Sequence, residues 1–299
     1  MGYEPWLSQG DVNANASQLG AYAVYLWRFG MNRRGQGNTY STVCGKLCAV
    51  RWYHKNTAGY DPGVNASHAI LLRGIRRFTS PVVKQRPLTP ELLRLIVQSL
   101  NLCTPRDQLL WGGLLLGYFF LLRRSEYLFI GRRHHDYILR LKDVRLLDAA
   151  QNDTIPRHAV MVSIRLTGAK NNQYGREEER FHFRSGDAVL CPVKAARWIK
   201  KAATTLKTNE NHPALSMSAA KGVNSKEMAN TVKAAARAAG LDPTRFSTHS
   251  VRIGGATSLL NSGADRLVLK VMGRWLSNAF EAYPVLTASG SKHLAQIMC

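Results

Sequence analysis

The chain has 299 residues, of which 45% are hydrophobic and 20% charged, so it can form the core of one large domain or two smaller ones. Lys and Arg number 41 against 19 Asp and Glu, and the net charge of +22 favours a polyanionic partner. The N-terminal residues lack the basic start and apolar stretch of a secretory leader, and the longest mostly apolar run, residues 109–122, is too short to cross a bilayer, so neither secretion nor a membrane span is expected.

The positive charge is not confined to one tail. Residues 1–87 carry a net charge of +8, and residues 88–299 carry +14. Both parts are therefore able to lie against the same polymer. A generally basic protein without such a partner is the alternative that charge alone leaves open.

The five cysteines are scattered, at positions 44, 48, 103, 191 and 299. Their number is odd and no CxxC pair occurs, so neither a disulfide framework nor a zinc site is predicted. Cys44 and Cys48 share a helix face near His54, where buried apolar residues are expected rather than metal ligands. This cysteine usage fits a reducing, intracellular compartment.

Apolar spacing predicts three helices in the first part of the chain, over residues 17–27, 39–55 and 64–78. Basic residues recur at helical spacing in two of them, so that each set shares one face. Such a face is either ordinary solvated surface or a stripe that faces the phosphates of a polyanionic partner. The candidate residues for such binding are Arg51, Lys55, Arg73, Arg76 and Arg77.

A polar, proline-bearing link at residues 79–87 marks the predicted domain boundary, which divides the chain into residues 1–85 and 86–299. Beyond it, Thr-Pro-Glu at residues 89–91 opens a helix to about residue 100. Thr-Pro-Arg-Asp at residues 104–107 opens a second helix, which is expected to run through the apolar stretch toward residue 122.

The middle of the chain predicts a small sheet between helices. Residues 137–148 and 159–167 have β-branched, alternating character, and residues 180–184 form the expected return strand after a polar turn. Helices are then predicted over residues 193–203 and 225–239, with further helices starting near residues 250, 264 and 277. The fold class is therefore mainly α with a small antiparallel β-sheet.

Four segments hold residues able to act on a phosphate. Arg123 is expected to emerge at the end of the apolar helix, where Glu126 can hold its charge. Lys170 lies in the polar turn between two predicted strands, from which a flexible ammonium group can donate a proton to a leaving oxygen. Taken singly, an arginine at a helix end and a lysine in a turn are more typical of solvated surface.

The other two segments lie near the C-terminus. His249 and Arg252 are spaced i and i+3 at a helix N-terminus, which brings an imidazole, a guanidinium and the positive end of the helix dipole together. The glycines at residues 254 and 255 allow another backbone to pack close. Tyr283 lies on a C-terminal helix, where a tyrosine is more often a packing residue.

In this order and spacing, the four segments resemble the tyrosine recombinase, or phage integrase, family. The family pattern is an arginine two residues before Ser-Glu, a hairpin lysine, a His-x-x-Arg motif, and a glycine-containing turn followed by a nucleophilic tyrosine. Those places are filled by Arg123, Lys170, His249, Arg252 and Tyr283. The resemblance covers residues 86–283, and the amino-acid sequences of the last two motifs are most similar to those of recombinases from eukaryotic mobile elements of the Crypton or DIRS kind.

One position departs from the family pattern. Many members have a histidine directly after the glycine of the last motif, whereas here Gly273 is followed by Arg274 and Trp275. The resemblance to eukaryotic relatives gives the supporting role to Trp275. Arg274 is the alternative, and it is also a candidate DNA-binding residue.

The resemblance implies a helical core-binding domain followed by a catalytic domain, and a reaction in which Tyr283 cuts and rejoins DNA without a metal or another cofactor. Double-stranded DNA is the expected partner, with no small-molecule substrate and no membrane. A homotetramer on two duplexes is implied, in which residues 284–299 either reach a neighbouring subunit or fold back on their own domain. The nucleus is the expected location, and integration or excision of a mobile element the expected role.

Rival readings share parts of this pattern. Type IB topoisomerases use a similar set of residues to relax DNA, and a non-catalytic DNA-binding protein derived from a recombinase would keep the fold. The latter is expected to have lost its nucleophile or an arginine, and all of these are present. An RNA-binding protein would show exposed aromatic residues between glycine and basic residues, a pattern that the sequence lacks.

Overall fold

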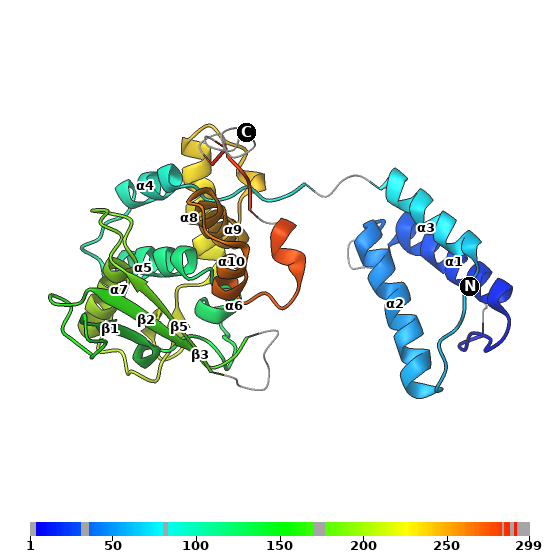
Figure 1. Cartoon of the computed structure of the whole chain (residues 1–299), viewed down its shortest axis with the longest axis horizontal. Coiled ribbons are helices and arrows are strands. Elements are labelled where there is room, and N and C mark those ends of the chain that lie inside the picture. The colour runs from blue at the N-terminus through cyan, green and yellow to red at the C-terminus, as the bar shows by residue number, and fades with distance from the viewer. Residues whose placement is uncertain are drawn as a thin grey trace. The chain divides into compact units, whose positions relative to one another are not determined.

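The computed structural model describes residues 4–30, 36–79, 83–169, 177–282, 284–287 and 290–291. The chain divides into two compact units, Met1–Val83 and Lys84–Cys299, and this division falls inside the polar link (Figure 1). No helix among the described residues is long and apolar enough to cross a membrane. The same residues contain no group of three or more His, Cys, Asp or Glu side chains placed to hold a metal ion.

The first unit is built from the helices α1 (Val12–Phe29), α2 (Tyr40–Thr57) and α3 (Ala66–Phe78). Helix α1 begins earlier than predicted because the Asp11 side chain accepts hydrogen bonds from the first backbone N–H groups of the helix. Apolar side chains from all three helices form one core. Its buried members include Leu19, Ala23, Leu26, Val43, Leu47 and Ile75.

The prediction that Cys44 and Cys48 are buried is wrong, since Cys48 is exposed and Cys44 is only partly covered. The buried face of α2 is instead formed by Val43, Leu47 and His54. Both ring nitrogens of His54 are engaged with the backbone: Nε2 accepts from the Leu7 N–H at 2.9 Å, and Nδ1 lies 2.9 Å from the Val50 carbonyl oxygen. His54 therefore has a structural role in this unit.

The second unit is centred on α5 (Pro105–Phe119), which is buried at every residue from 108 to 118. It lies against α7 (Pro192–Leu206), and a Cβ atom added at Gly112 would lie 2.6 Å from a side-chain carbon of Ile199. The predicted helix starts are confirmed for α4 (Pro90–Gln98) and α5, where Thr89 and Thr104 cap the first turns. The remaining long helices are α8 (Ser225–Ala238), α9 (Thr248–Asn261) and α10 (Arg266–Gly273).

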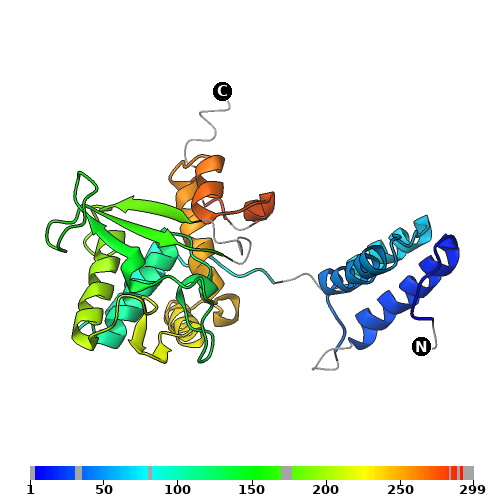
Figure 2. The ribbon, with the colours of Figure 1, turned by 90° about the horizontal axis from the view of Figure 1, so that it is seen from below.

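A three-stranded antiparallel sheet packs on α7, in the order β1 (Val144–Leu147), β2 (Met161–Leu166) and β3 (Glu178–Phe183) (Figure 2). The first strand is shorter than the predicted residues 137–148 because Leu141–Asp143 form a 3₁₀ turn. A second sheet, which the sequence did not predict, pairs β4 (Ser216–Ser218) with β5 (Lys221–Gly222).

The chain breaks sharply after α5, which corrects the prediction of a helix that reaches residue 122. Leu121 has a left-handed conformation with φ of 51°, and a new short helix, α6 (Arg124–Tyr127), follows. Arg123 therefore lies at the N-cap of α6 rather than on the end of α5. The predicted helix near residue 277 is a 3₁₀ segment, η3 (Asn278–Ala282).

The close approach predicted for the Gly254-Gly255 pair of α9 is confirmed. A Cβ atom at Gly254 would lie 2.1 Å from the Leu88 carbonyl oxygen, and one at Gly255 would lie 2.0 Å from the Tyr118 carbonyl oxygen. A larger residue at position 254 would push α9 away from the backbone of Leu88, and one at position 255 would push it away from the end of α5. These glycines thus bring the α9 residues near the turn that carries Arg123.

Candidate active site

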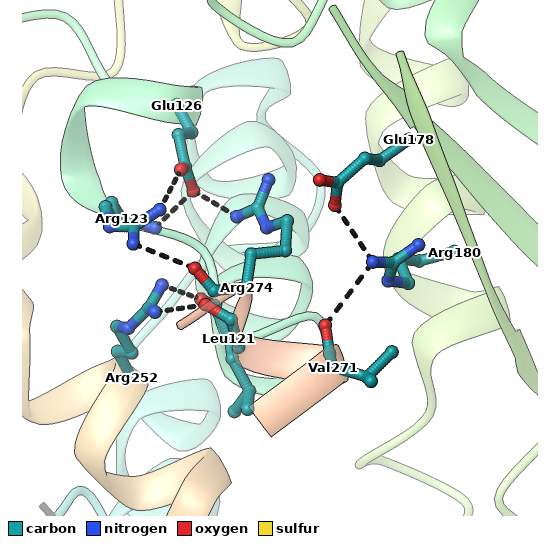
Figure 3. Close-up of polar contacts among 9 residues, drawn as sticks. Leu121, Arg123, Glu126, Glu178, Arg180, Arg252, Val271 and Arg274 are labelled. Carbon is teal, nitrogen blue, oxygen red and sulfur yellow. Dashed lines mark hydrogen bonds and ion pairs between the residues drawn. The ribbon is translucent and has the colours of Figure 1, made fainter. Parts of the chain in front are cut away.

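Arg123 is fixed by both its backbone and its side chain. Its N–H donates to Glu126 Oε2 at 2.6 Å, and its Nη1 donates to Glu126 Oε1 at 3.0 Å. Its Nη2 donates to the backbone carbonyl oxygen of Arg274 at 3.2 Å, across 151 residues of sequence. The prediction that Glu126 holds Arg123 is confirmed (Figure 3).

Arg252 lies in the first half of α9 and is only 4% exposed. Its two terminal nitrogens donate to the carbonyl oxygens of Leu121 and Gly273, which belong to the break after α5 and to the end of α10. The guanidinium carbon also lies 4.3 Å from the centre of the Trp275 ring. These contacts join three separate segments at one buried cation.

Arg274 follows α10 in a left-handed conformation, with φ of 52°, and its side chain is 6% exposed. Its Nη2 lies 2.5 Å from Glu126 Oε2, so Glu126 binds two arginines at once. The Nε and Nη1 atoms of Arg274 are buried and have no hydrogen-bond partner among the residues that the structure describes. Such donors are costly to bury unless a ligand satisfies them.

Arg123 and Arg274 thus place two guanidinium groups against the carboxylate of Glu126, which has no exposed surface, while Arg252 binds carbonyl oxygens of the adjoining segments. Burying this excess positive charge is unfavourable unless an anion compensates it. Planar guanidinium groups with several donors match the oxygens of a phosphate. The cluster is therefore suited to hold a phosphodiester.

Trp275 faces the apolar side of this cluster. It is 8% exposed and packs with Leu121, Ala256, Leu269 and Phe280, the last at a ring distance of 5.4 Å. Its ring covers one face of the Arg252 guanidinium, an attractive arrangement for a cation on an aromatic surface. Trp275 therefore supports Arg252, whereas Arg274 directs its side chain toward Glu126 and Arg123 (Figure 3).

A cavity of about 270 Å³ opens beside the arginines. It lies between α10 and the adjoining ends of β2 and β3, and Ala169, the last described residue before Lys170, is part of its wall. Lys170 itself and Tyr283 lie outside the described residues. The basic side chains that line the cavity belong to Arg123, Arg180, Lys270 and Arg274.

Arg180 is a cavity residue that sequence reasoning missed. It donates from Nη2 to Glu178 Oε2 at 2.9 Å, and to the Val271 carbonyl oxygen at 3.4 Å, which connects β3 to α10 (Figure 3). Its Nε atom is buried and has no hydrogen-bond partner within the described part of the chain. The sequence signal was the position of Arg180 at the predicted return strand, which did not by itself indicate the cavity.

His249 is exposed in the first turn of α9, which the Ser247 side chain caps by accepting the His249 N–H at 3.2 Å. Atoms packed around the ring remove part of its hydration and lower the imidazole pKa, and the positive charge of Arg252 lowers it further. Contact of the ring with solvent limits both effects. His249 is thus biased toward the neutral form, which accepts a proton.

The other candidate DNA-binding residues belong to the first unit. Arg51 makes a two-pronged ion pair with Asp61, at 2.8 and 2.9 Å, so its charge is partly compensated. Lys55 is exposed near the end of α2. The three exposed arginines of α3 are Arg73, Arg76 and Arg77, of which Arg76 also lies 5.9 Å from the centre of the Tyr40 ring.

The sequence matches no family model and no curated protein. Solved structures of recombinases are similar. The XerH site-specific recombinase bound to palindromic difH substrate has a TM-score of 0.59 at 12% identity, over 95% of this chain and 70% of that chain. The Tn1549 transposon integrase in complex with circular intermediate DNA has a TM-score of 0.52 at 12% identity, over 96% and 86%. The fold is that of tyrosine recombinases, which confirms the predicted fold class.

Proposed function

We propose that the protein is a site-specific recombinase or integrase, which cuts and rejoins double-stranded DNA through Tyr283. The observation that carries this proposal is the pairing of Arg123 and Arg274 with one buried carboxylate, Glu126, beside a cavity where β2 ends and β3 begins. Two guanidinium groups against one carboxylate, with buried Arg274 donors left without a hydrogen-bond partner among the described residues, favour an anionic ligand of phosphate geometry. The recombinase fold supports DNA as the source of that phosphate.

In the proposed reaction, the Tyr283 oxygen attacks a phosphorus atom of DNA and the bond to the 5′-oxygen breaks. A 3′-phosphotyrosyl bond and a free 5′-hydroxyl result. One phosphodiester is exchanged for another, so the reverse reaction rejoins DNA without an external energy source. By resemblance, Lys170 protonates the leaving 5′-oxygen, and neutral His249 assists proton transfer.

The arginines stabilise the negative charge that builds up on the non-bridging oxygens in the transition state. Arg123 and Arg252 are assigned this role by resemblance. Arg274, whose buried donors lie beside Glu126, is proposed as a third arginine in the same role. Trp275 fixes the plane of Arg252 by stacking on it. Because these groups supply the charge, the reaction as proposed requires no metal ion and no other cofactor.

The wider assignments rest on the sequence resemblance. Residues 1–85 act as a core-binding domain that contacts DNA through the basic faces of α2 and α3, and residues 86–299 form the catalytic domain. A homotetramer assembles on two duplexes. The chain serves integration or excision of a mobile element of the Crypton or DIRS kind, and works in the nucleus.

The test is a covalent trapping assay. The protein is incubated in metal chelator with a pool of nicked duplexes from the DNA that flanks its coding sequence, and is then denatured. Wild type is expected to form a DNA–protein adduct, and Tyr283→Phe none. Tight binding without an adduct in wild type would contradict the enzyme and favour a DNA-binding derivative.

A second assay separates recombination from DNA relaxation. A recombinase transfers the trapped strand to a second duplex that carries the same site, whereas a topoisomerase rejoins it within one molecule and relaxes supercoiled DNA at many sites. We expect site-dependent transfer. Relaxation without transfer would favour the type IB topoisomerase reading.

A further inference from the structure

A second cavity, of about 400 Å³, lies away from the proposed active site, between the end of α4, the first half of α5 and the first half of α7. Its described lining residues include none of those around the first cavity. Strand β3 begins at the first cavity with Glu178 and Arg180, and the chain reaches Ala188 in the second cavity soon after the strand ends. A strand of six residues spans about 17 Å, so the two cavities lie at opposite ends of β3. In Figure 1, α7 lies at the left of this unit and α10, which borders the first cavity, at its right.

The lining of the second cavity is largely apolar. Trp111 of α5 is 1% exposed, and the partly buried side chains packed against the core around it are those of Val97, Leu102, Val189 and Trp198. A cavity of this size can enclose a large side chain or a small ligand. An apolar group that entered it would leave water and contact apolar side chains on several sides, which favours binding.

The basic residues of this cavity come from one face of α7. They are Lys194, Arg197 and Lys201, whose helical spacing places all three on the same side of the helix as Trp198. The described lining residues include no Asp or Glu. A cavity with an apolar lining and three cations favours a ligand that is apolar in one part and anionic in another.

The described contacts of these three cations are with backbone oxygens and an aromatic ring, rather than with carboxylates. Lys194 Nζ and Arg197 Nη2 each donate to a backbone carbonyl oxygen, in the second case that of Arg157 at 3.2 Å. Lys201 Nζ lies 5.3 Å from the centre of the Trp198 ring. Their positive charge therefore remains available to an anionic partner.

Arg197 also has an unsatisfied donor. Its Nε atom is buried and has no hydrogen-bond partner within the ranges that the structure describes, which is costly unless a ligand satisfies it. Burial and the positive charge of Arg184 lower the pKa of the Arg197 guanidinium, so positive charge is in excess at this position. A carboxylate matches such a group, because it can accept two N–H bonds of one guanidinium at once.

We propose that this cavity docks an acidic peptide segment of a partner protein. An aromatic or leucine side chain of the segment enters the apolar cavity, and carboxylates beside it bind the basic residues of α7. Residues 284–299 of this chain contain no Asp or Glu, so the same segment of a second copy lacks the required charge. The apolar lining also distinguishes the cavity from a plain phosphate contact, for which charge alone suffices. The proposal does not rest on the cutting reaction.

The test uses the full chain and labelled synthetic peptides, in which one aromatic or leucine residue is flanked by randomised aspartate and glutamate. One control library has asparagine and glutamine in place of the acids, and another has serine in place of the apolar residue. Fluorescence polarisation should show binding of the acidic apolar library and binding weaker by about tenfold or more for both controls. Equal binding of the serine library would overturn the proposal, because charge alone would then explain it. Absence of binding by all three libraries would overturn it as well.

Two variants test whether the peptide binds in this cavity. Lys201→Glu reverses an exposed charge, and Ala188→Phe narrows the cavity from an exposed position, so both are compatible with folding. Each should weaken peptide binding by about tenfold or more, the first because like charges then meet. Arg237→Glu on α8 is the matched control, exposed and outside the cavity lining, and should bind the peptide as wild type does. Unchanged binding in Lys201→Glu and Ala188→Phe would overturn the proposal.

Two further measurements separate this cavity from a surface that binds DNA. Arg274→Ala should leave the peptide affinity unchanged, since Arg274 lines the other cavity. The dissociation constant for duplex DNA should be the same in Lys201→Glu and in Arg237→Glu, which have equal net charge. A DNA affinity that falls in Lys201→Glu alone, by the same factor as the peptide affinity, would overturn the proposal and assign this face of α7 to DNA.

Discussion

Arg274 Nη2 lies 2.5 Å from Glu126 Oε2, in an ion pair that joins positions 148 residues apart in the sequence. The same carboxylate accepts from the backbone and side chain of Arg123. One fully buried acid therefore sets the positions of two of the three arginines in the proposed active site.

Replacing Glu126 by Gln should destabilise the fold. The change keeps the shape of the side chain but removes the carboxylate that pairs with Arg123 and Arg274, and breaking a buried ion pair of this kind typically costs about 3–5 kcal/mol. The measurement is the free energy of unfolding in denaturant, with and without bound DNA. DNA should restore part of the loss, because its phosphate compensates the arginines. An unchanged free energy of unfolding would show that Glu126 does not balance them.

Arg274→Ala should lower the rate of adduct formation by about 10² to 10³, the usual effect of losing one transition-state donor. Arg274→Lys should recover little of this rate, since a point charge does not reproduce the planar fork. The exposed Arg237→Ala on α8 is the control for loss of charge alone. Equal rates for Arg274→Ala and the control would exclude a role for Arg274 in cutting.

Trp275→Ala should lower the free energy of unfolding by about 3–5 kcal/mol, because it empties a buried site between Arg252 and Phe280. Trp275→Phe keeps an aromatic face under the guanidinium, so it should retain most of the cutting rate. Chemical denaturation and trapping together check this. A Phe variant that folds but has lost the cutting rate would point to the indole N–H as a direct phosphate donor.

Cutting should persist in mild acid. The pKa of His249 is lowered from its ordinary 6.5, so the neutral, proton-accepting form persists below pH 6.5. The cutting rate should therefore begin to fall only below pH 6.5. The unfolded chain takes up this proton more readily than the folded one, so the same residue lowers stability as the pH drops. The measurement is the pH–rate profile of wild type and His249→Asn. If the rate falls at the same acid pH in both proteins, a group other than His249 is responsible for that fall.

The arginines of α3 should contribute to the salt dependence of DNA binding. Removing one phosphate contact reduces the slope of log K against log salt by about one, so Arg73→Ala or Arg77→Ala should have this effect. Arg51→Ala should have less effect, since Asp61 already compensates Arg51. Binding isotherms across a salt series measure these slopes. Equal slopes for wild type and the α3 variants would show that α3 does not contact DNA phosphates.

Local chemistry allowed much of the fold to be predicted. Threonine caps followed by proline marked the starts of α4 and α5, and alternating residues marked β2. The break after α5 was not predictable in this way, because Leu121 is a strong helix former that tertiary packing holds in a left-handed conformation. The strands β4 and β5 have three and two residues, which is too short for an alternating pattern to be recognised in the sequence.

The site was predicted by motif rather than by geometry. The order of the segments named Arg123, Arg252 and Arg274, and the structure brings Arg123 and Arg274 to one carboxylate and Arg252 to the Leu121 carbonyl oxygen two residues before Arg123. The Glu126–Arg274 pair and the place of Arg180 in the cavity depend on contacts between distant segments, which no local pattern encodes. Lys170 and Tyr283 lie outside the described residues and remain predictions.

The most direct test of the central claim is to locate the covalent bond. The adduct trapped on a nicked duplex is digested with trypsin and nuclease, and the peptide that carries a nucleotide is sequenced by mass spectrometry. Cleavage after Arg274 and Lys292 yields a peptide of residues 275–292 whose one tyrosine is Tyr283. The account predicts a nucleotide 3′-phosphate on that tyrosine. A nucleotide on any other residue would contradict it.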